Sequence, residues 1–261
     1  MKKVILGTVS SLLLASTLFG NVSQKQCVSK GEDFIYAGKE CIQLAVSSGE
    51  VEDVINIIVH GTWAKGTNTL GRYAPFAETL NMNTDITTIA VALPGYSNSS
   101  TNHLNSLSHE GDSNLAATKE YIVFLEDLVK QLKKRYDAKT INLIGHSAGG
   151  MMSATLVGFN PNLIQAVTVA GGRFSIDEKE SKKGMISISD FIDNVKKDTK
   201  ILLVYGTKDK ISKPKVTTDF YKLALSKGLN VKLIKVEGAE HIDLDMTDES
   251  VEAITEMISE E

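Results

Sequence analysis

The stretch that decides the fold is residues 140–154, TINLIGHSAGGMMSA. Thr140 to Ile144 is apolar and predicts a buried strand, and Ala148 to Gly158 predicts a helix. Between them, Gly145-His146-Ser147-Ala148-Gly149 predicts a sharp strand-to-helix turn that exposes a serine hydroxyl at the top of a sheet. Such a turn strains the backbone of the serine and requires small neighbours, which Gly145, Ala148, Gly149 and Gly150 supply.

Ser147 is therefore a candidate nucleophile, although Gly-x-Ser-x-Gly alone is a weak pattern. A serine hydroxyl is a poor nucleophile without a base, so a histidine must lie beside it. Among the five histidines, His241 fits best, because it follows the predicted strand Val231 to Val236 and precedes the last helix. A loop in that position can reach across the top of the sheet to Ser147.

The base needs a carboxylate that orients it and stabilises its charged form. Asp209 directly follows the predicted strand Ile201 to Tyr205, which gives the chain order Ser…Asp…His typical of this kind of turn. Asp177 is the main rival. Asp243 and Asp245 lie too close to His241 in sequence to be natural choices.

An oxyanion needs backbone donors, each contributing about 3 kcal/mol. The N–H of Ala148 is one candidate. The second is expected from the loop His60-Gly61-Thr62-Trp63, where Thr62 is the first choice and Trp63 the runner-up. His60 is expected to brace this loop. Trp63 and Tyr96 are candidate pocket residues, although core packing explains a single tryptophan equally well.

The remaining pattern alternates strands with helices, which predicts a doubly wound, mostly parallel sheet with helices on both faces. A weak hairpin around Gly38 predicts antiparallel edge strands at the N-terminus. Ser97 to Asp112 is a long polar loop that could cover the site, and Arg173 to Asp198 has room for a helix near Ile188 to Val195 but not for a lid domain. The further expected elements are strands Val54 to Val59, Thr88 to Leu93 and Ala166 to Ala170, and helices Tyr73 to Leu80, Leu115 to Tyr136, Lys213 to Lys227 and Ser250 to Ser259.

These motifs, in this order, resemble the α/β-hydrolase fold superfamily from about Val54 to the C-terminus. Within it, the chain resembles the compact esterases and dienelactone-hydrolase-like members without a large cap. The resemblance rests on His60-Gly61, Pro94-Gly95-Tyr96-Ser97, residues 145–150, Gly206-Thr207-Lys208-Asp209 and Gly238-Ala239-Glu240-His241. The oxyanion loop departs from the Gly-rich form of many lipases.

The resemblance implies hydrolysis of a small-molecule carboxylic ester through an acyl-enzyme, with no metal and no organic cofactor. Two alternatives stay open: a serine peptidase of the same fold, and a non-catalytic binding protein. The fold alone names no substrate.

The N-terminus predicts export. Residues 1–23 have the layout of a signal peptide, with cleavage between about Gly20 and Ser23, and residues 24–261 are expected to form one domain in the periplasm or outside the cell, without a stable membrane anchor. In an oxidising compartment Cys27 and Cys41 can form a disulfide; free thiols are the alternative. A formal charge of −4 without a basic stripe argues against nucleic acid as a partner, and the sequence does not indicate an oligomeric state.

Overall fold

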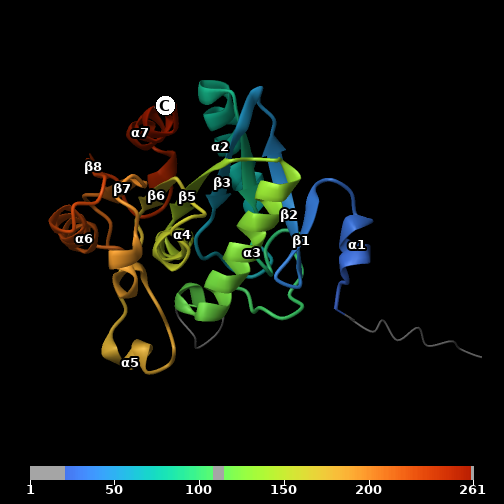
Figure 1. Cartoon of the computed structure of the whole chain (residues 1–261), viewed down its shortest axis with the longest axis horizontal. Helices are drawn as coiled ribbons and strands as arrows, with labels where there is room; N and C mark the ends of the chain where they lie inside the picture. The colour runs from blue at the N-terminus through green and yellow to red at the C-terminus, as the bar shows by residue number, and fades with distance from the viewer. Residues whose placement is uncertain (1–20, 108–114, 260–261) are drawn as a thin grey trace, which may run out of the picture.

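The computed structural model describes residues 21–107 and 115–259. These residues form one eight-stranded sheet in the order β1-β2-β4-β3-β5-β6-β7-β8 (Figure 1). The pairs β1–β2 and β2–β4 are antiparallel and every other pair is parallel, which confirms the predicted sheet with its antiparallel edge. The strands are β1 (Phe34–Ala37), β2 (Glu40–Ser47), β3 (Val51–Val59), β4 (Ile86–Val91), β5 (Thr140–His146), β6 (Ala166–Ala170), β7 (Lys200–Gly206) and β8 (Val231–Val236).

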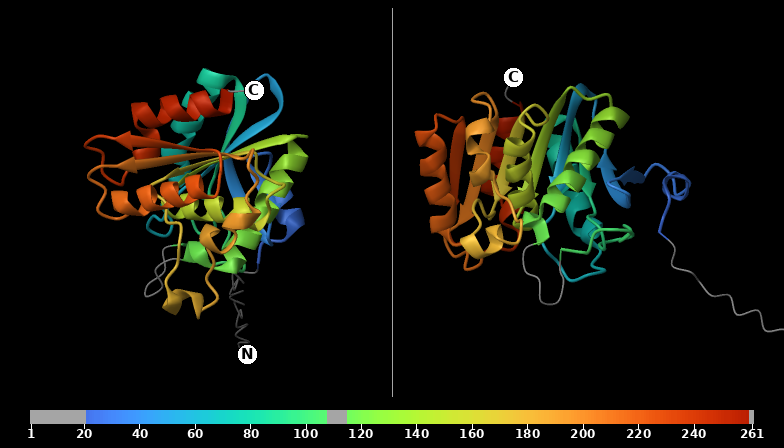
Figure 2. Two further views of the ribbon diagram at one scale, coloured as in Figure 1. Left: turned by 60° about the vertical axis from the view of Figure 1, so that its left-hand side comes forward. Right: turned by 60° about the horizontal axis from the view of Figure 1, so that its bottom comes forward.

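Helices cover both faces of the sheet. Figure 2 shows α2 and α7 on one face and α3, α4 and α6 on the other. Each face buries its own hydrophobic cluster, so the strands between them are apolar on both sides. The helices are α1 (Gln24–Val28), α2 (Thr69–Thr84), α3 (Lys119–Arg135), α4 (Ala148–Phe159), α5 (Glu178–Ser181), α6 (Pro214–Ser226) and α7 (Asp248–Ser259).

The sheet order positions the functional loops. In the sheet, β4 lies on one side of β3 and β5 lies on the other. The loop that leaves β3 and the loop that leaves β5 therefore run in opposite directions from the carboxyl ends of these two strands. A crevice at such a point is where open α/β sheets bind ligands. The Gly-x-Ser-x-Gly turn follows β5 there, and the loop that begins at His60 follows β3.

The N-terminal hairpin is held by two features. The predicted disulfide joins Cys27 to Cys41, which ties α1 to β2. Beside it, the fully buried Glu40 carboxylate accepts bonds from the Ser100 hydroxyl and from the backbone N–H groups of residues 102, 103 and 104, at 2.5 to 2.9 Å. Glu40 therefore anchors the first half of the long polar loop to the sheet, a role that the sequence pattern did not indicate.

Two helices differ from the prediction. The helix expected from Tyr73 to Leu80 spans Thr69–Thr84, because Asn68 caps it by accepting a bond from the Gly71 N–H, while the apolar pattern marks only its buried middle. The helix expected near Ile188 to Val195 is wrong: two short 3₁₀ turns stand there instead. Ser187 and Asp190 form a capping box at the start of the first turn, but each turn is only three residues long, Ile188–Asp190 and Ile192–Asn194.

Some expectations lie outside the described residues. Residues 1–20 of the predicted signal peptide are among them, as are His109 and the part of the polar loop beyond residue 107. Within the described ranges, no helix is both long and apolar enough to cross a membrane.

Candidate active site

Ser147 occupies the predicted turn in a strained conformation. β5 ends at His146 and α4 begins at Ala148, and between them Ser147 has φ 53° and ψ −117°. A non-glycine residue with positive φ is uncommon and needs support from its surroundings. The Ser147 N–H supplies it by donating to the Ala170 carbonyl at the end of β6, at 2.8 Å. The turn thus presents the hydroxyl at the carboxyl edge of the sheet.

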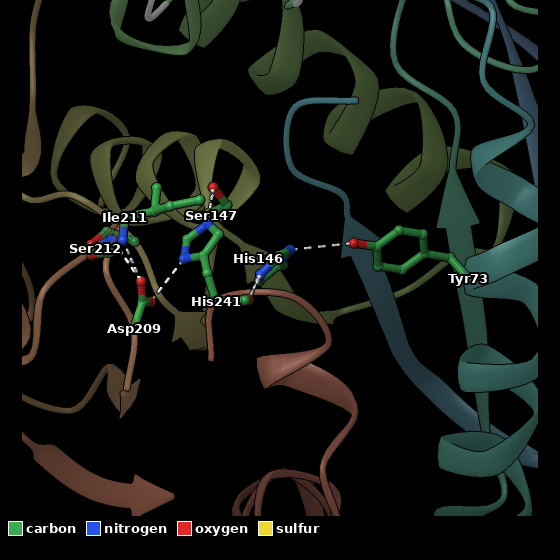
Figure 3. Close-up of polar contacts among 8 residues, drawn as sticks. Tyr73, His146, Ser147, Asp209, Ile211, Ser212 and His241 are labelled. Carbon is green, nitrogen blue, oxygen red and sulfur yellow. Dashed lines mark hydrogen bonds and ion pairs between the residues drawn. The ribbon is translucent and has the colours of Figure 1, made fainter. Parts of the chain in front are cut away.

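The loop after β8 brings His241 to Ser147. His241 Nε2 lies 2.8 Å from Ser147 Oγ, and His241 Nδ1 lies 2.7 Å from Asp209 Oδ2 (Figure 3). Because the carboxylate can only accept, Nδ1 carries the proton and Nε2 is free to accept the serine hydroxyl proton. This is the tautomer that a general base for Ser147 requires.

Asp209 is held rigidly beneath the imidazole. Its side chain has no exposed surface, whereas that of His241 is 10% exposed. The second carboxylate oxygen, Oδ1, accepts the backbone N–H groups of Ile211 and Ser212, each at 2.8 Å (Figure 3). Both oxygens therefore have partners, and the carboxylate cannot rotate away from His241 without losing three bonds.

The rival carboxylates lie elsewhere. Asp177 caps α5 by accepting a bond from the backbone N–H of Glu180, and Asp243 forms an ion pair with Arg72. Asp245 is buried, and its oxygens make no hydrogen bond with His241 or any other described residue. Asp209 is thus the carboxylate that the fold brings to His241.

The loop after β3 lies against the serine. Gly61 approaches so closely that an added Cβ would stand 2.9 Å from the Cβ of Ser147. Thr62 is exposed, and the Trp63 N–H points to the Tyr96 hydroxyl at 3.4 Å. The Trp63 N–H, the second choice for an oxyanion donor, therefore already has a partner. Thr62 remains the better candidate donor on this loop. The Ala148 amide belongs to the first turn of α4, where helix N–H groups lack an intrahelical partner.

His60 braces this loop from below. Its Nδ1–H donates to the Gly61 carbonyl at 2.6 Å, and its Nε2 accepts the Leu93 N–H at 3.0 Å. Both ring nitrogens are used by backbone groups, so His60 has no free position from which to act as a base. Burial lowers the pKa of His60 from 6.5 to about 4, and the ring is neutral at pH 7.

Tyr96 does not line an open pocket, which corrects the prediction. Its side chain has no exposed surface, packs edge-on against His60 at 4.7 Å, and donates its hydroxyl to the Trp63 carbonyl at 3.1 Å. It supports the oxyanion loop instead. Trp63 itself is half-buried, with the Arg72 guanidinium 4.8 Å from the centre of its ring.

The candidate site contains no metal-ligand cluster. Across residues 21–107 and 115–259, no group of three or more His, Cys, Asp or Glu side chains has the arrangement of a metal site. The groups that the described residues bring together at this edge of the sheet are a hydroxyl, an imidazole and a carboxylate, with backbone amides beside them.

Comparisons with known proteins agree with this architecture. A protein-family model described as alpha/beta hydrolase fold matches residues 57–185. No curated protein sequence matches the chain.

Solved structures share the fold at low sequence identity. An esterase from Pyrococcus furiosus superposes with a TM-score of 0.66 at 18% identity, covering 86% of this chain and 90% of that one. Est1E from Butyrivibrio proteoclasticus, solved with ferulic acid bound, gives 0.61 at 17% identity, covering 87% and 96%. A CIB-like hydrolase from Thermoplasma acidophilum gives 0.63 at 19% identity, covering 88% and 97%.

Proposed function

The chain belongs to the α/β-hydrolase superfamily, and on that premise we propose that it is a serine hydrolase that cleaves carboxylic esters, with Ser147 as nucleophile, His241 as base and Asp209 as the residue that orients the base. The observation that carries the proposal is the unbroken path from Ser147 Oγ through the His241 ring to the buried Asp209 carboxylate, at 2.8 and 2.7 Å.

The reaction proceeds in two halves. His241 Nε2 takes the hydroxyl proton of Ser147 as Oγ attacks the ester carbonyl carbon, and a tetrahedral intermediate forms. The imidazolium then gives that proton to the leaving alkoxide, the carbon–oxygen bond to the alcohol breaks, and an acyl-Ser147 ester remains. Water then attacks this ester as His241 takes one of its protons. The bond between the acyl carbon and Ser147 Oγ breaks, the imidazolium returns the proton to Oγ, and the carboxylic acid leaves.

The surrounding groups favour the charges that develop. Asp209 stabilises the imidazolium through the Nδ1–H bond, and its own bonds to two backbone amides hold it in place. The backbone N–H groups of Ala148 and Thr62 are the proposed oxyanion donors, and removal of one such donor costs about 3 kcal/mol in other enzymes. The N-terminus of α4 adds a favourable dipole at the same point.

Ester cleavage is preferred over peptide cleavage because two of the similar structures are an esterase and a protein solved with ferulic acid bound. A carboxylic acid of that kind is a product that an ester hydrolase would release. Within the described residues, no observation specifically favours a peptidase or a non-catalytic binding protein.

The test is hydrolysis of p-nitrophenyl acetate and butyrate by the purified protein. Ser147→Ala should lower kcat by roughly 10⁴-fold or more, because no other group replaces the nucleophile. Ser153→Ala is a matched control, since Ser153 lies on α4, which Ser147 precedes, is fully buried, and its hydroxyl has no hydrogen-bond partner among the described residues. Equal activity of Ser147→Ala and wild type, or labelling of another residue by a fluorophosphonate probe, contradicts the assignment.

We also propose that the protein acts after export. A disulfide between Cys27 and Cys41 supports this, because such bonds persist in oxidising compartments. N-terminal sequencing of the protein from cell-free medium or periplasm should find a chain that begins between about residues 21 and 24; an intact Met1 on the active, folded protein contradicts export by cleavage.

A further inference from the structure

His146 precedes the nucleophile in sequence and contacts the base in space. It is 4% exposed, and its ring lies 5.1 Å from the ring of His241. Its Nε2 is 2.8 Å from the backbone carbonyl oxygen of His241, and its Nδ1 is 3.4 Å from the hydroxyl of Tyr73 (Figure 3). The proposed catalytic mechanism uses none of these contacts.

The chemistry of the partners assigns the protons. A carbonyl oxygen only accepts, so His146 carries its hydrogen on Nε2 and donates it to His241. The remaining nitrogen, Nδ1, then has a lone pair, and the Tyr73 hydroxyl donates to it. The result is a directed chain from Tyr73 on α2, through His146 at the end of β5, to the backbone of His241 after β8.

The tyrosine is held in the form that can donate. Tyr73 is 1% exposed. Burial raises its pKa, and the nearby carboxylate of Asp245 raises it further. Asp245 lies on the same loop as His241, in the 3₁₀ turn Leu244–Met246. This loop is therefore near Tyr73 at Asp245 as well as near His146 at His241.

The loop after β8 is held at two other points, because the Ala239 carbonyl accepts the Lys208 N–H at 2.9 Å and Asp243 pairs with Arg72. His146 binds the carbonyl of His241 itself, the residue that carries the base. A displacement of about 1 Å between reacting groups can cost about 100-fold in rate. His146 directly precedes Ser147 and donates to the carbonyl of His241. This bond therefore fixes the backbone of the base relative to the backbone of the nucleophile.

We propose that Tyr73 and His146 are positioning residues that hold the backbone of His241 at hydrogen-bonding distance from Ser147. This inference rests on the proposed function. Neither residue touches the reacting atoms. The hydrogen bonds from Tyr73 through His146 fix the position of the base. Their loss should therefore lower kcat and leave substrate binding nearly unchanged.

The experiment compares four variants in the full-length protein. His146→Leu removes both bonds and should lower kcat for p-nitrophenyl butyrate about 100-fold. Tyr73→Phe removes the outer bond and keeps the bond from His146 to His241, so it should lower kcat about tenfold; KM should change less than about twofold in both. His146→Gln offers an amide N–H near the position of Nε2 and should recover most of the loss. Tyr121→Phe is the matched control, because Tyr121 is similarly buried and its hydroxyl has no hydrogen-bond partner among residues 21–107 and 115–259.

A second readout is independent of substrate. The Nδ1 proton of His241, bound to Asp209, should give a low-field imidazole signal in the proton NMR spectrum. His146→Leu should broaden or abolish that signal, while His146→Gln and Tyr121→Phe should keep it; circular dichroism establishes that each variant is folded. If wild type hydrolyses no ester and Ser147 resists fluorophosphonate, the proposed function fails, and the NMR comparison still decides the positioning role.

Two results overturn the inference. One is a folded His146→Leu protein whose kcat and low-field signal match those of wild type. The other is a fall in kcat that His146→Gln does not relieve and that follows the loss of folded protein. That pattern would mean that His146 is needed for core packing and does not position His241.

Discussion

Acidification should destabilise this protein through His60, which is buried and neutral. Its two nitrogens already serve the Gly61 carbonyl and the Leu93 N–H. A second proton would have to sit on Nε2, directly against the Leu93 N–H, so that two donors would face each other. Together with burial, this keeps the folded protein from accepting the proton until its pKa of about 4.

The size and sign follow from the two pKa values. The unfolded chain has the ordinary value of 6.5 and the folded protein about 4, so the unfolded chain takes up the proton first as the pH falls. The free energy of unfolding should therefore decrease between pH 6.5 and 4, by about 3 kcal/mol in total from this residue. Above pH 7 and below pH 4, His60 should not change the free energy of unfolding as the pH varies.

The assay is urea unfolding of wild type and His60→Asn at intervals from pH 7.5 to 4. The asparagine variant should be less stable at pH 7, because it cannot meet both backbone partners, but its stability should fall by about 3 kcal/mol less on acidification. All other titrating groups are common to the two proteins and cancel in the comparison. Equal losses in the two proteins would refute the reasoning.

Three further outcomes are expected. Asp209→Asn should lower kcat by about 10⁴-fold in a folded protein, because an amide presents the wrong group to the base, and steady-state kinetics measures this. Gly171→Ala should lower kcat and cost about 1 kcal/mol in urea unfolding, because Gly171 has φ 59° and an added Cβ would stand 3.3 Å from Asp209 Oδ2; unchanged kinetics would contradict it. Replacement of Cys27 and Cys41 by serine should cost about 3 kcal/mol in the same assay, given a sequence separation of 14, and no change would mean that the unfolded chain is not restrained by the bond.

The sheet could be predicted because its strands are short, apolar and separated by clear helices. β6 and β8 have the predicted bounds, and β3 and β5 extend the predicted strands at one end only. The residues expected to meet at the carboxyl edge, Ser147, Asp209 and His241, do lie within hydrogen-bond distance in series. That expectation needed only the rule that parallel strands end together at one edge of the sheet.

The segment between β6 and β7 could not be predicted in the same way. Its 3₁₀ turns, Ile188–Asp190 and Ile192–Asn194, are each too short to show a helical apolar period. Tyr96 was also misplaced. It was predicted to line the substrate pocket, whereas its ring is fully buried and its hydroxyl donates to the Trp63 carbonyl.

Among the residues that support the site, the sequence predicted that His60 braces its own loop, but it indicated neither the contact of His60 with Leu93 nor any role for His146. His60 joins the β3 loop to Leu93, and His146 joins the β5 turn to the loop after β8. A backbone partner can be any residue type, so no second motif marks the contact. The reacting groups, by contrast, must be a hydroxyl, an imidazole and a carboxylate, and are restricted in kind. The sequence therefore predicts the reacting groups and the bracing role of His60, whereas the backbone groups that His60 and His146 bind in other loops require coordinates.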